Sequence, residues 1–307
     1  MCCSICSSSS FKVIKKYKNH NSFFDNKTIC ECNLCGMQFV NPMPLAEEWE
    51  NYNASYFLNA HGGNEISNWV LYYNIGIAKI RLLSLTEYIE LNEIKIKSVL
   101  EIGPGRGFLM EQWLNKFPDT SYYVVESDET VHGQIIKKGG TIINSTDVSK
   151  IGEVDLIIAT HVLEHTLKPL AFLKKFCGVL RTGGAIFVET PCQDHLYKNL
   201  HEPHVQFFDK SNLKDCFNEL EFNNLSLTYN GDKISRIRMI STLKKVVIKL
   251  ERILKIPLHL LLGDFWPNLM KFNLSKNEAL AIVETSPHIE KMTKSRWVRC
   301  FGQKTAK

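Results

Sequence analysis

Hydrophobic positions in the middle of the chain fall into short apolar runs that alternate with stretches of helical spacing. The runs are rich in Val, Ile, Leu and Tyr, and they predict β-strands at residues 97–102, 121–126, 152–161 and 185–190. After the first run, apolar residues recur every three or four positions and predict an amphipathic helix; they are Phe108, Leu109, Trp113, Leu114 and Phe117. A second helix is predicted from about Pro169 to Leu180, where Arg181 and two glycines would end it. Strands that alternate with helices indicate an α/β fold with a largely parallel sheet.

The same patterns continue on both sides of this region. Residues 67–91 predict one long amphipathic helix capped by Ser67, with an apolar face of Trp69, Tyr72, Tyr73, Ile77, Ile80 and Leu83. Residues 225–229 and 296–302 predict two further strands. Between them, residues 236–262 combine Ile, Leu and Val with Lys and Arg, and predict a basic amphipathic helix. The predicted organisation has three parts: an N-terminal cysteine-rich segment at residues 1–44, a helical linker or cap at 45–95, and an α/β domain at 96–307 with a helical insertion at about 235–295.

Three glycines at alternate positions follow the first predicted strand. Gly103, Gly105 and Gly107 can adopt positive φ and allow a ligand to approach the backbone at a helix N-terminus. A dinucleotide-binding turn has the spacing G-x-G-x-x-G, whereas this turn is E-x-G-x-G-x-G, with Glu101 before the glycines. A carboxylate there would repel a pyrophosphate and attract a cationic amino-acid group. The alternative is a tight turn that binds no ligand.

The run from Glu101 to Gly107 resembles motif I of the class I S-adenosylmethionine (SAM) dependent methyltransferases. Further features occur in the order of that family. Glu126 ends the second strand, where an α/β nucleotide site places a carboxylate on the ribose. The segments H-V-L-E-H at 161–165 and G-G-A-I-F-V-E-T-P at 183–191 follow. The resemblance covers roughly residues 97–232.

This resemblance implies a fold and a cofactor. The fold is a Rossmann-like seven-stranded methyltransferase sheet of order 3-2-1-4-5-7-6, with the seventh strand antiparallel. The cofactor is SAM. The residues implied to bind it are Glu101, Gly103, Gly105, Gly107, Glu126, Asp147, His161 and Tyr56.

Six of the ten cysteines lie in the first 35 residues. Two C-x-x-C pairs, Cys3 with Cys6 and Cys32 with Cys35, have spacing suited to a tetrahedral structural Zn²⁺ site. The cysteines at positions 2 and 30 could each replace a ligand, and a set of unpaired thiols is the alternative to a metal site. Residues 35–44 resemble the end of the zinc ribbon found at the N-terminus of one branch of SAM methyltransferases. Residues 1–44 are therefore predicted to form a zinc ribbon.

A tyrosine-rich segment at residues 51–57 matches the same branch. The resemblance implies that Tyr52 or Tyr56 covers the methionine end of SAM. Aromatic packing on the domain surface is the alternative for both side chains.

Methyl transfer to a hydroxyl or an acidic carbon needs a group that removes the proton of the acceptor, usually His, Asp or Glu. Five histidines follow the fourth and fifth predicted strands: His161, His165, His195, His201 and His204. Residues 201–208 resemble the H-x-x-F-F stretch of the family, in which His204 is the matching histidine. His204 and His161 are therefore the catalytic candidates, and packing of His204 against residues 161–165 is the alternative. A metal at His201 and His204 would need a third ligand, which the sequence does not mark.

Charge and hydropathy limit the setting in which the protein works. A net charge of +5 and an isoelectric point near 8.6 are too weakly basic to indicate nucleic-acid binding by themselves. The sequence contains no run of 18 apolar residues, so no transmembrane helix is predicted, and no signal peptide is apparent. A cytoplasmic, reducing environment follows as the default and favours thiols or metal ligands over disulfides. The basic residues 236–262 leave three roles open: a lid, a membrane-surface helix, or a clamp for an anionic substrate.

These observations predict a SAM-dependent methyltransferase that acts on a small molecule or a glycan, with oxygen as the favoured methyl-accepting atom. A basic lid suits an acceptor with phosphate or pyrophosphate, such as a nucleotide-linked or lipid-linked sugar. Residues 159–162 lack the Asn/Asp-Pro-Pro-aromatic tetrapeptide typical of enzymes that methylate exocyclic amines. The first alternative is an RNA methyltransferase that binds nucleic acid through Lys12, Lys15, Lys16 and Lys18 of the ribbon. The second is a non-catalytic SAM-binding module; no oligomeric state is predicted.

Overall fold

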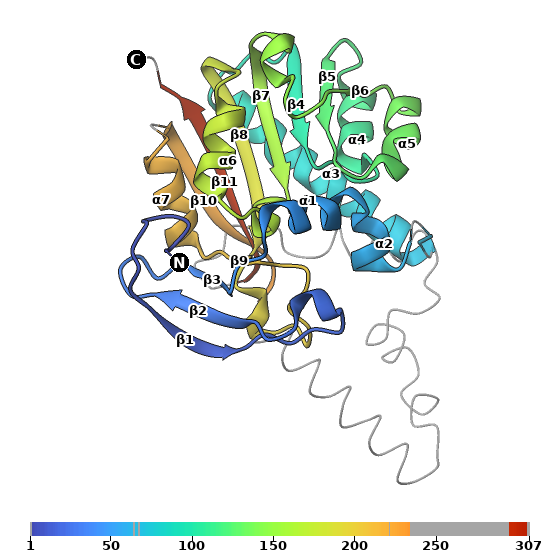
Figure 1. The fold of residues 1–307 in the computed structure, drawn as a ribbon. Coiled ribbons are helices and arrows are strands. Elements are labelled where there is room, and N and C mark those ends of the chain that lie inside the picture. The colour runs from blue at the N-terminus through green and yellow to red at the C-terminus, as the bar shows by residue number, and fades with distance from the viewer. Residues whose placement is uncertain (1, 64, 67, 221, 234–294, 306–307) are drawn as a thin grey trace, which may run out of the picture.

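The computed structural model describes residues 2–63, 65–66, 68–220, 222–233 and 295–305 (Figure 1). The predicted basic helix at 236–262, nearly all of the predicted insertion at 235–295, and the predicted cap Ser67 lie outside these residues. The described residues form one sheet of seven strands and one of four. None of the described helices is long and apolar enough to cross a membrane.

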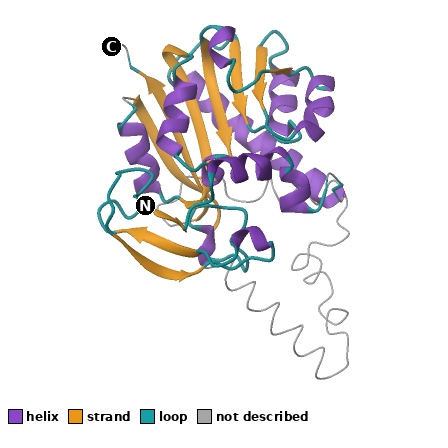
Figure 2. Cartoon of the chain, viewed as in Figure 1, coloured by secondary structure: helices purple, strands orange, loops and turns teal. Residues whose placement is uncertain are grey.

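The seven-stranded sheet is the centre of the fold, and helices cover both of its faces (Figure 2). Its strands are β4 (Ser98–Ile102), β5 (Ser121–Val125), β6 (Thr141–Ile142), β7 (Val154–Thr160), β8 (Leu180–Pro191), β10 (Phe222–Lys233) and β11 (Ser295–Lys304). They lie in the order β10-β11-β8-β7-β4-β5-β6, with β11 antiparallel to both of its neighbours. Numbered along the chain, this is the order 3-2-1-4-5-7-6, so the predicted α/β fold and its topology are confirmed.

Neighbouring residues of each central strand face opposite sides of the sheet, as expected for strands that are buried on both faces. Val99 of β4 belongs to an apolar cluster with α3, α4 and α5, and Leu100 belongs to a cluster with α6 and α7. These helices are α3 (Asn68–Leu91), α4 (Phe108–Lys116), α5 (His132–Lys137), α6 (Pro169–Cys177) and α7 (Lys210–Asn218). The sheet is therefore the middle layer of three, which leaves the ends of its strands as the place for a site.

The end of α6 differs from the prediction. The helix ends at Cys177, because Leu180 already pairs with Val154 as the first residue of β8. The glycines that were expected to end the helix lie inside the strand. A Cβ at Gly184 would come within 2.9 Å of the carbonyl oxygen of Asp155, so this glycine allows β8 to approach β7 closely.

The long helix α3 is confirmed, but one residue of its predicted apolar face is wrong. Ile77 and Ile80 are buried, whereas Leu83 is 58% exposed and Leu85 is buried in its place. Side-chain packing against the sheet selects the buried positions, and the helix is apolar on more than one side. In the N-terminal segment, Ser22–Phe24 form a 3-10 helix.

The N-terminal segment forms an antiparallel sheet of β1 (Phe11–Lys16), β2 (Thr28–Cys32) and β3 (Gln38–Asn41). A fourth strand, β9 (Gln206–Phe207), pairs with β3 although it comes from the chain beyond β8. This small sheet thus includes a piece of the larger domain, and the division at residue 44 stays a prediction. Two short helices, α1 (Ala46–Ala54) and α2 (Tyr56–His61), lie along the edge of the large sheet where β7 ends (Figure 1).

Candidate functional site

The turn after β4 has a backbone geometry that favours glycine. Gly103, Gly105 and Gly107 have φ of 64°, 57° and 68°, in the left-handed region that other residues rarely adopt. A Cβ at Gly103 would lie 2.7 Å from Val162 Cγ2, so the turn passes close to the segment that follows β7. Since β4 and β7 are parallel neighbours, the two segments form one surface at the carboxyl ends of the strands.

Glu126 lies against this turn. Its carboxylate accepts hydrogen bonds from the backbone N–H groups of Gly105 and Asp128, both at 3.0 Å. Burial raises the pKa of Glu126, and these hydrogen bonds oppose the rise. A carboxylate oxygen can accept more than one hydrogen bond, so Glu126 keeps acceptor capacity for the ribose hydroxyls of a cofactor.

Glu101 lies beneath the turn and is only 1% exposed. The hydroxyl of Tyr122 donates to its Oε2 at 2.8 Å. Burial raises the pKa of Glu101 to about 7. The side chain is thus held by the neighbouring strand β5, and its contact with a cofactor stays a prediction.

The helix α2 covers the turn from the other side. Its Phe57 N–H donates to Asp128 Oδ2 at 2.8 Å. The Phe57 ring would lie 3.5 Å from a Cβ at Gly105, and the Arg106 guanidinium lies 4.4 Å from the ring centroid. The aromatic ring and the glycine turn therefore face each other.

The two candidate tyrosines, Tyr52 and Tyr56, pack against different neighbours. Tyr52 stacks on Trp49 at 5.2 Å between ring centroids, within a cluster of the ribbon and α1. Tyr56 instead lies 5.3 Å from the ring of His165. Burial raises the pKa of Tyr56, and the nearby carboxylates of Glu164 and Glu126 raise it further. Tyr56 therefore lies beside His165 and Phe57, and its role in covering SAM stays a prediction.

His161 directly follows β7 and has a φ of 57°, which is uncommon for a residue other than glycine. Its Nδ1 lies 3.1 Å from Glu164 Oε1, and its Nε2 lies 3.3 Å from Glu189 Oε1. Burial alone would lower the pKa of His161, but the two carboxylates raise it above its usual value. Glu189 in turn binds the guanidinium groups of Arg81 and Arg299, which hold its pKa well below the usual range in spite of burial.

A second group of side chains follows His161. Donor atoms of Glu164, His165 and His204 all lie within 4.8 Å of one another. Burial lowers the pKa of His165 to about 3. Burial alone would raise the pKa of Glu164, but the hydrogen bond from His161 and the charges of His161, His165 and His204 together lower it to about 2. His204 Nδ1 lies 2.7 Å from Asp194 Oδ2.

The remaining candidates lie elsewhere. His195 contacts Gln38 of the ribbon at 2.6 Å, and His201 Nδ1 accepts a hydrogen bond from the Lys18 N–H at 2.9 Å. Both histidines therefore join the ribbon to the large domain. Asp147 pairs with Lys150 at 2.8 Å after β6, and no hydrogen bond or ion pair among the described residues connects it to the glycine turn.

Sequence reasoning missed Glu164, Glu189, Asp194, Arg81 and Arg299 as site residues. Glu164 lies inside the H-V-L-E-H segment and Glu189 in the G-G-A-I-F-V-E-T-P segment, so both were within reach of the motif comparison. The two arginines lie far apart in the chain, on α3 and β11, and only the fold brings them to Glu189.

The four predicted metal-ligating cysteines come together at the front of the chain. The Sγ atoms of Cys3 and Cys35 lie 3.5 Å apart, as do those of Cys6 and Cys32, and all four lie within 4.8 Å of one another. A tetrahedral zinc site with Zn–S bonds of about 2.3 Å has sulfur atoms roughly 3.8 Å apart, so the arrangement fits Zn²⁺. Cys30 instead contacts Thr28 Oγ1 at 3.6 Å, and Cys2 is exposed.

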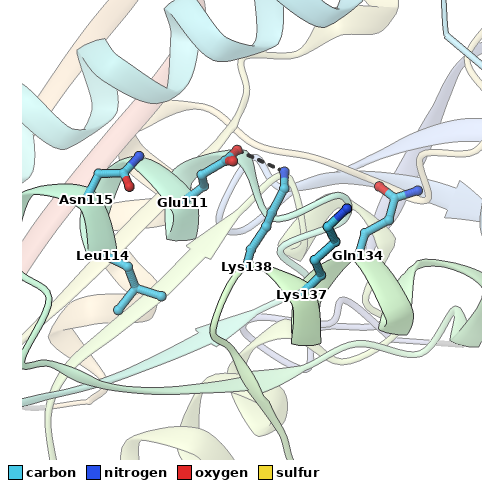
Figure 3. A pocket seen from close by; sticks show the side chains of 6 residues that line it. All are labelled: Glu111, Leu114, Asn115, Gln134, Lys137 and Lys138. Atoms are coloured by element: carbon cyan, nitrogen blue, oxygen red, sulfur yellow. Dashed lines mark ion pairs between the residues drawn. The ribbon is translucent and has the colours of Figure 1, made fainter.

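A separate pocket of about 550 Å³ lies between α4 and α5 (Figure 3). It is lined by Glu111, Leu114, Asn115, Gln134, Lys137 and Lys138, and Glu111 pairs with Lys138 at 3.0 Å. None of the predicted site residues lines it. The lysines at its surface and the ion pair between Glu111 and Lys138 do not indicate a ligand.

Comparisons with known proteins agree with this fold. Residues 78–227 match the model of a family described as a methyltransferase domain. The structure is similar to a SAM-dependent methyltransferase from Thermotoga maritima, with a TM-score of 0.52 and 14% identity over 84% of this chain and 100% of that one. It is also similar to the plantazolicin methyltransferase BpumL in complex with SAH, with a TM-score of 0.52 and 12% identity over 85% and 98%. At these identities the likeness shows the fold alone, and the comparison with curated proteins found no match.

Proposed function

We propose that this chain is a class I SAM-dependent methyltransferase and transfers the methyl group of SAM to an oxygen atom of a small molecule or glycan. The contacts of His161 are the observation that supports oxygen. Its ring lies 3.1 Å from Glu164 and 3.3 Å from Glu189, and 32% of the side chain is exposed. A histidine held in this way can take up the proton that a hydroxyl loses during methyl transfer.

The cofactor end of the site is formed by the glycine turn and α2. When bound, SAM supplies a methyl group that its sulfonium activates. Glu126 would accept hydrogen bonds from the ribose, Gly103, Gly105 and Gly107 would allow close approach, and Tyr56 would cover the methionine end. Glu101 and Asp147 are weaker candidates, because one is buried beneath the turn and the other is paired with Lys150.

The proton leaves the acceptor through His161. Its Nδ1 donates to Glu164 in the tautomer that suits this pair, so Nε2 is the nitrogen that takes the proton. A carbon–oxygen bond forms as the carbon–sulfur bond breaks, and the proton of the hydroxyl goes to His161 Nε2. Glu164 and Glu189 stabilise the resulting imidazolium, and general-base catalysis of this kind contributes about 10²–10⁴-fold.

His204 is the second candidate on the acceptor side. Only 6% of it is exposed, and Asp194 contacts its Nδ1. It is therefore better suited to hold or orient a partner at Nε2 than to exchange protons with solvent. We infer that it contributes to acceptor binding beside His165.

The acceptor class is proposed from charge. The basic residues 236–262 favour an acceptor with phosphate or pyrophosphate, such as a nucleotide-linked or lipid-linked sugar. An RNA acceptor is less well supported, because two of the four ribbon lysines are already engaged. Lys12 pairs with Glu31 at 2.8 Å, and Lys15 donates to the carbonyl oxygen of His195.

For the cysteine cluster we propose a structural Zn²⁺ held by Cys3, Cys6, Cys32 and Cys35. Four thiolates leave no open position for a substrate, so such a site contributes to folding and takes no part in the chemistry.

The proposal can be tested with SAM that carries a ¹³C-labelled methyl group. The full-length protein is incubated with labelled SAM and either a small-molecule extract or total RNA of the cells that make it. We expect the label in small molecules, with a methyl-carbon NMR shift typical of an O-methyl group. A label in RNA, or at nitrogen or carbon, would contradict the proposal.

A variant pair tests the base. His161→Gln should lower the rate of transfer by about 10²–10⁴-fold with little change in SAM affinity, because general-base catalysis is lost. His20 is exposed, and His20→Gln is the matched control that should keep the full rate. Full activity of His161→Gln would rule out its role as the base.

A further inference from the structure

We propose that Glu164, His165 and His204 form a second metal site, distinct from the cysteine cluster, for a divalent cation that prefers mixed nitrogen and oxygen ligands. The residues come from two segments that the fold brings together, one after β7 and one before β9. Their donor atoms all lie within 4.8 Å of one another. His165 Nε2 is 4.0 Å from Glu164 Oε1, and the rings of His165 and His204 are 4.9 Å apart.

The surroundings of these side chains orient them as ligands. Asp194 Oδ2 contacts His204 Nδ1 at 2.7 Å, which leaves Nε2 of His204 for a metal. Glu164 is contacted on one oxygen by His161 and on the other by the Thr190 hydroxyl at 3.2 Å. A carboxylate behind a ligating histidine and hydrogen bonds to a ligating carboxylate are the usual outer contacts of protein metal sites.

The cluster also has unfilled bonding capacity. Nδ1 of His165 is buried and has no hydrogen-bond partner among the residues that the structure describes. Glu164 is 1% exposed and His204 6% exposed, so bulk water does not solvate this group freely. A buried polar nitrogen without a partner is rare in native proteins, and a metal ion coordinated by His165 Nδ1 would supply the missing partner.

The donor set limits the cation. Two imidazoles and one carboxylate suit Mn²⁺, Fe²⁺, Co²⁺ or Zn²⁺, and three protein ligands leave positions open for water or substrate. Four thiolates select Zn²⁺ over Mn²⁺, so Mn²⁺ is a probe that separates the two sites.

The catalytic consequence rests on the proposed function. A cation on these residues would bind the acceptor oxygen and lower the pKa of its hydroxyl. The neighbouring His161, 3.1 Å from Glu164, would then receive the proton. His204 would thus be a ligand and His161 the base, which assigns different roles to the two catalytic candidates.

The test measures metal binding without the methyl-transfer reaction. Full-length protein is titrated with Mn²⁺ while the electron paramagnetic resonance signal of free Mn²⁺ is followed, and total bound metal is then measured by elemental analysis. We expect the wild type to hold one more equivalent of divalent metal, as Mn²⁺ or another ion, than His204→Gln. His20→Gln is the matched control and should equal the wild type.

Two further variants make the result specific. Asp194→Asn should weaken Mn²⁺ binding by about 10–100-fold, the usual effect of losing an outer carboxylate. The amide of His161→Gln can still donate to Glu164 but cannot act as a base. This variant should therefore keep the Mn²⁺ equivalent and lose methyl transfer, so failure of the base assignment can be told from failure of the metal site. SAM binding by calorimetry shows that each variant is folded. Equal metal content in wild type and His204→Gln would overturn the proposal.

Discussion

A methyl group added at Gly103 should damage the protein in a way that the geometry lets us calculate. Gly103 has a φ of 64°, and its Cβ would lie 2.7 Å from Val162 Cγ2. The left-handed conformation costs an alanine roughly 1–2 kcal/mol, and overpacking against a neighbour costs about 1–3 kcal/mol. Gly103→Ala should therefore lower the free energy of unfolding by about 2–5 kcal/mol.

Two further variants separate the cost of the left-handed backbone from the cost of the clash with Val162. Gly62 also has a left-handed backbone, with φ of 72°, but has nothing within 4 Å of its Cβ position, so Gly62→Ala should cost only the conformational part. In the double variant Gly103→Ala with Val162→Ala the clash disappears, and a coupling of about 1–3 kcal/mol should be recovered. Urea denaturation followed by tryptophan fluorescence measures all of these. If Gly103→Ala were no worse than Gly62→Ala, or if Val162→Ala gave no rescue, the close approach of the turn to the segment after β7 would be refuted.

Three other perturbations test separate parts of the molecule. Glu126→Ala should weaken SAM binding about 10–100-fold through lost hydrogen bonds to a charged group, whereas exposed Glu129→Ala should not; calorimetry distinguishes them. The Arg181 guanidinium and the N–H groups of residues 97 and 98 lower the pKa of Asp155 despite burial, so its contribution is present above about pH 4 and is lost as the pH falls through the lowered pKa. Asp155→Asn should therefore cost about 1–3 kcal/mol at pH 7 and less in acid, as denaturation at several pH values would show. Cys32→Ser should abolish stoichiometric zinc and lower the thermal midpoint, while Cys2→Ser, at an exposed cysteine, should change neither.

The sequence allowed prediction of the features that depend on neighbouring residues. The strand before Gly103 and the helix after Gly107 were predicted because their apolar spacing and the glycines are local. The sheet order came from the resemblance and proved correct. The prediction that Leu83 lies on the buried face was wrong, because a helix that is apolar on several sides does not show by itself which side meets the sheet. The predicted end of α6 was wrong because Gly184 allows β8 to approach Asp155 and has no role in ending the helix.

The site was harder to predict because its side chains come from distant parts of the chain. Glu189 receives Arg81 from α3 and Arg299 from β11, and neither arginine lies near a recognised motif. In the proposed second metal site, Glu164 would supply the third ligand that a metal at His204 lacked in the sequence, and His165 would replace His201. Such groupings depend on the register of strands, which local patterns do not determine.

The position of His204 depends on the ribbon as well as on the large sheet. The strand β9, which follows His204 closely, is the edge strand of the small sheet and pairs with β3. The Tyr17 hydroxyl donates to the carbonyl oxygen of His204 at 2.9 Å, and Asn212 donates to the carbonyl oxygen of Cys35 at 3.0 Å. A two-residue strand has little stability of its own, so the loop that carries His204 keeps its place only while the ribbon is folded. A four-cysteine ribbon of this size would depend on the proposed Zn²⁺ to fold. Its removal should then disturb the acceptor side more than the cofactor side, where the glycine turn rests on β4 and β7.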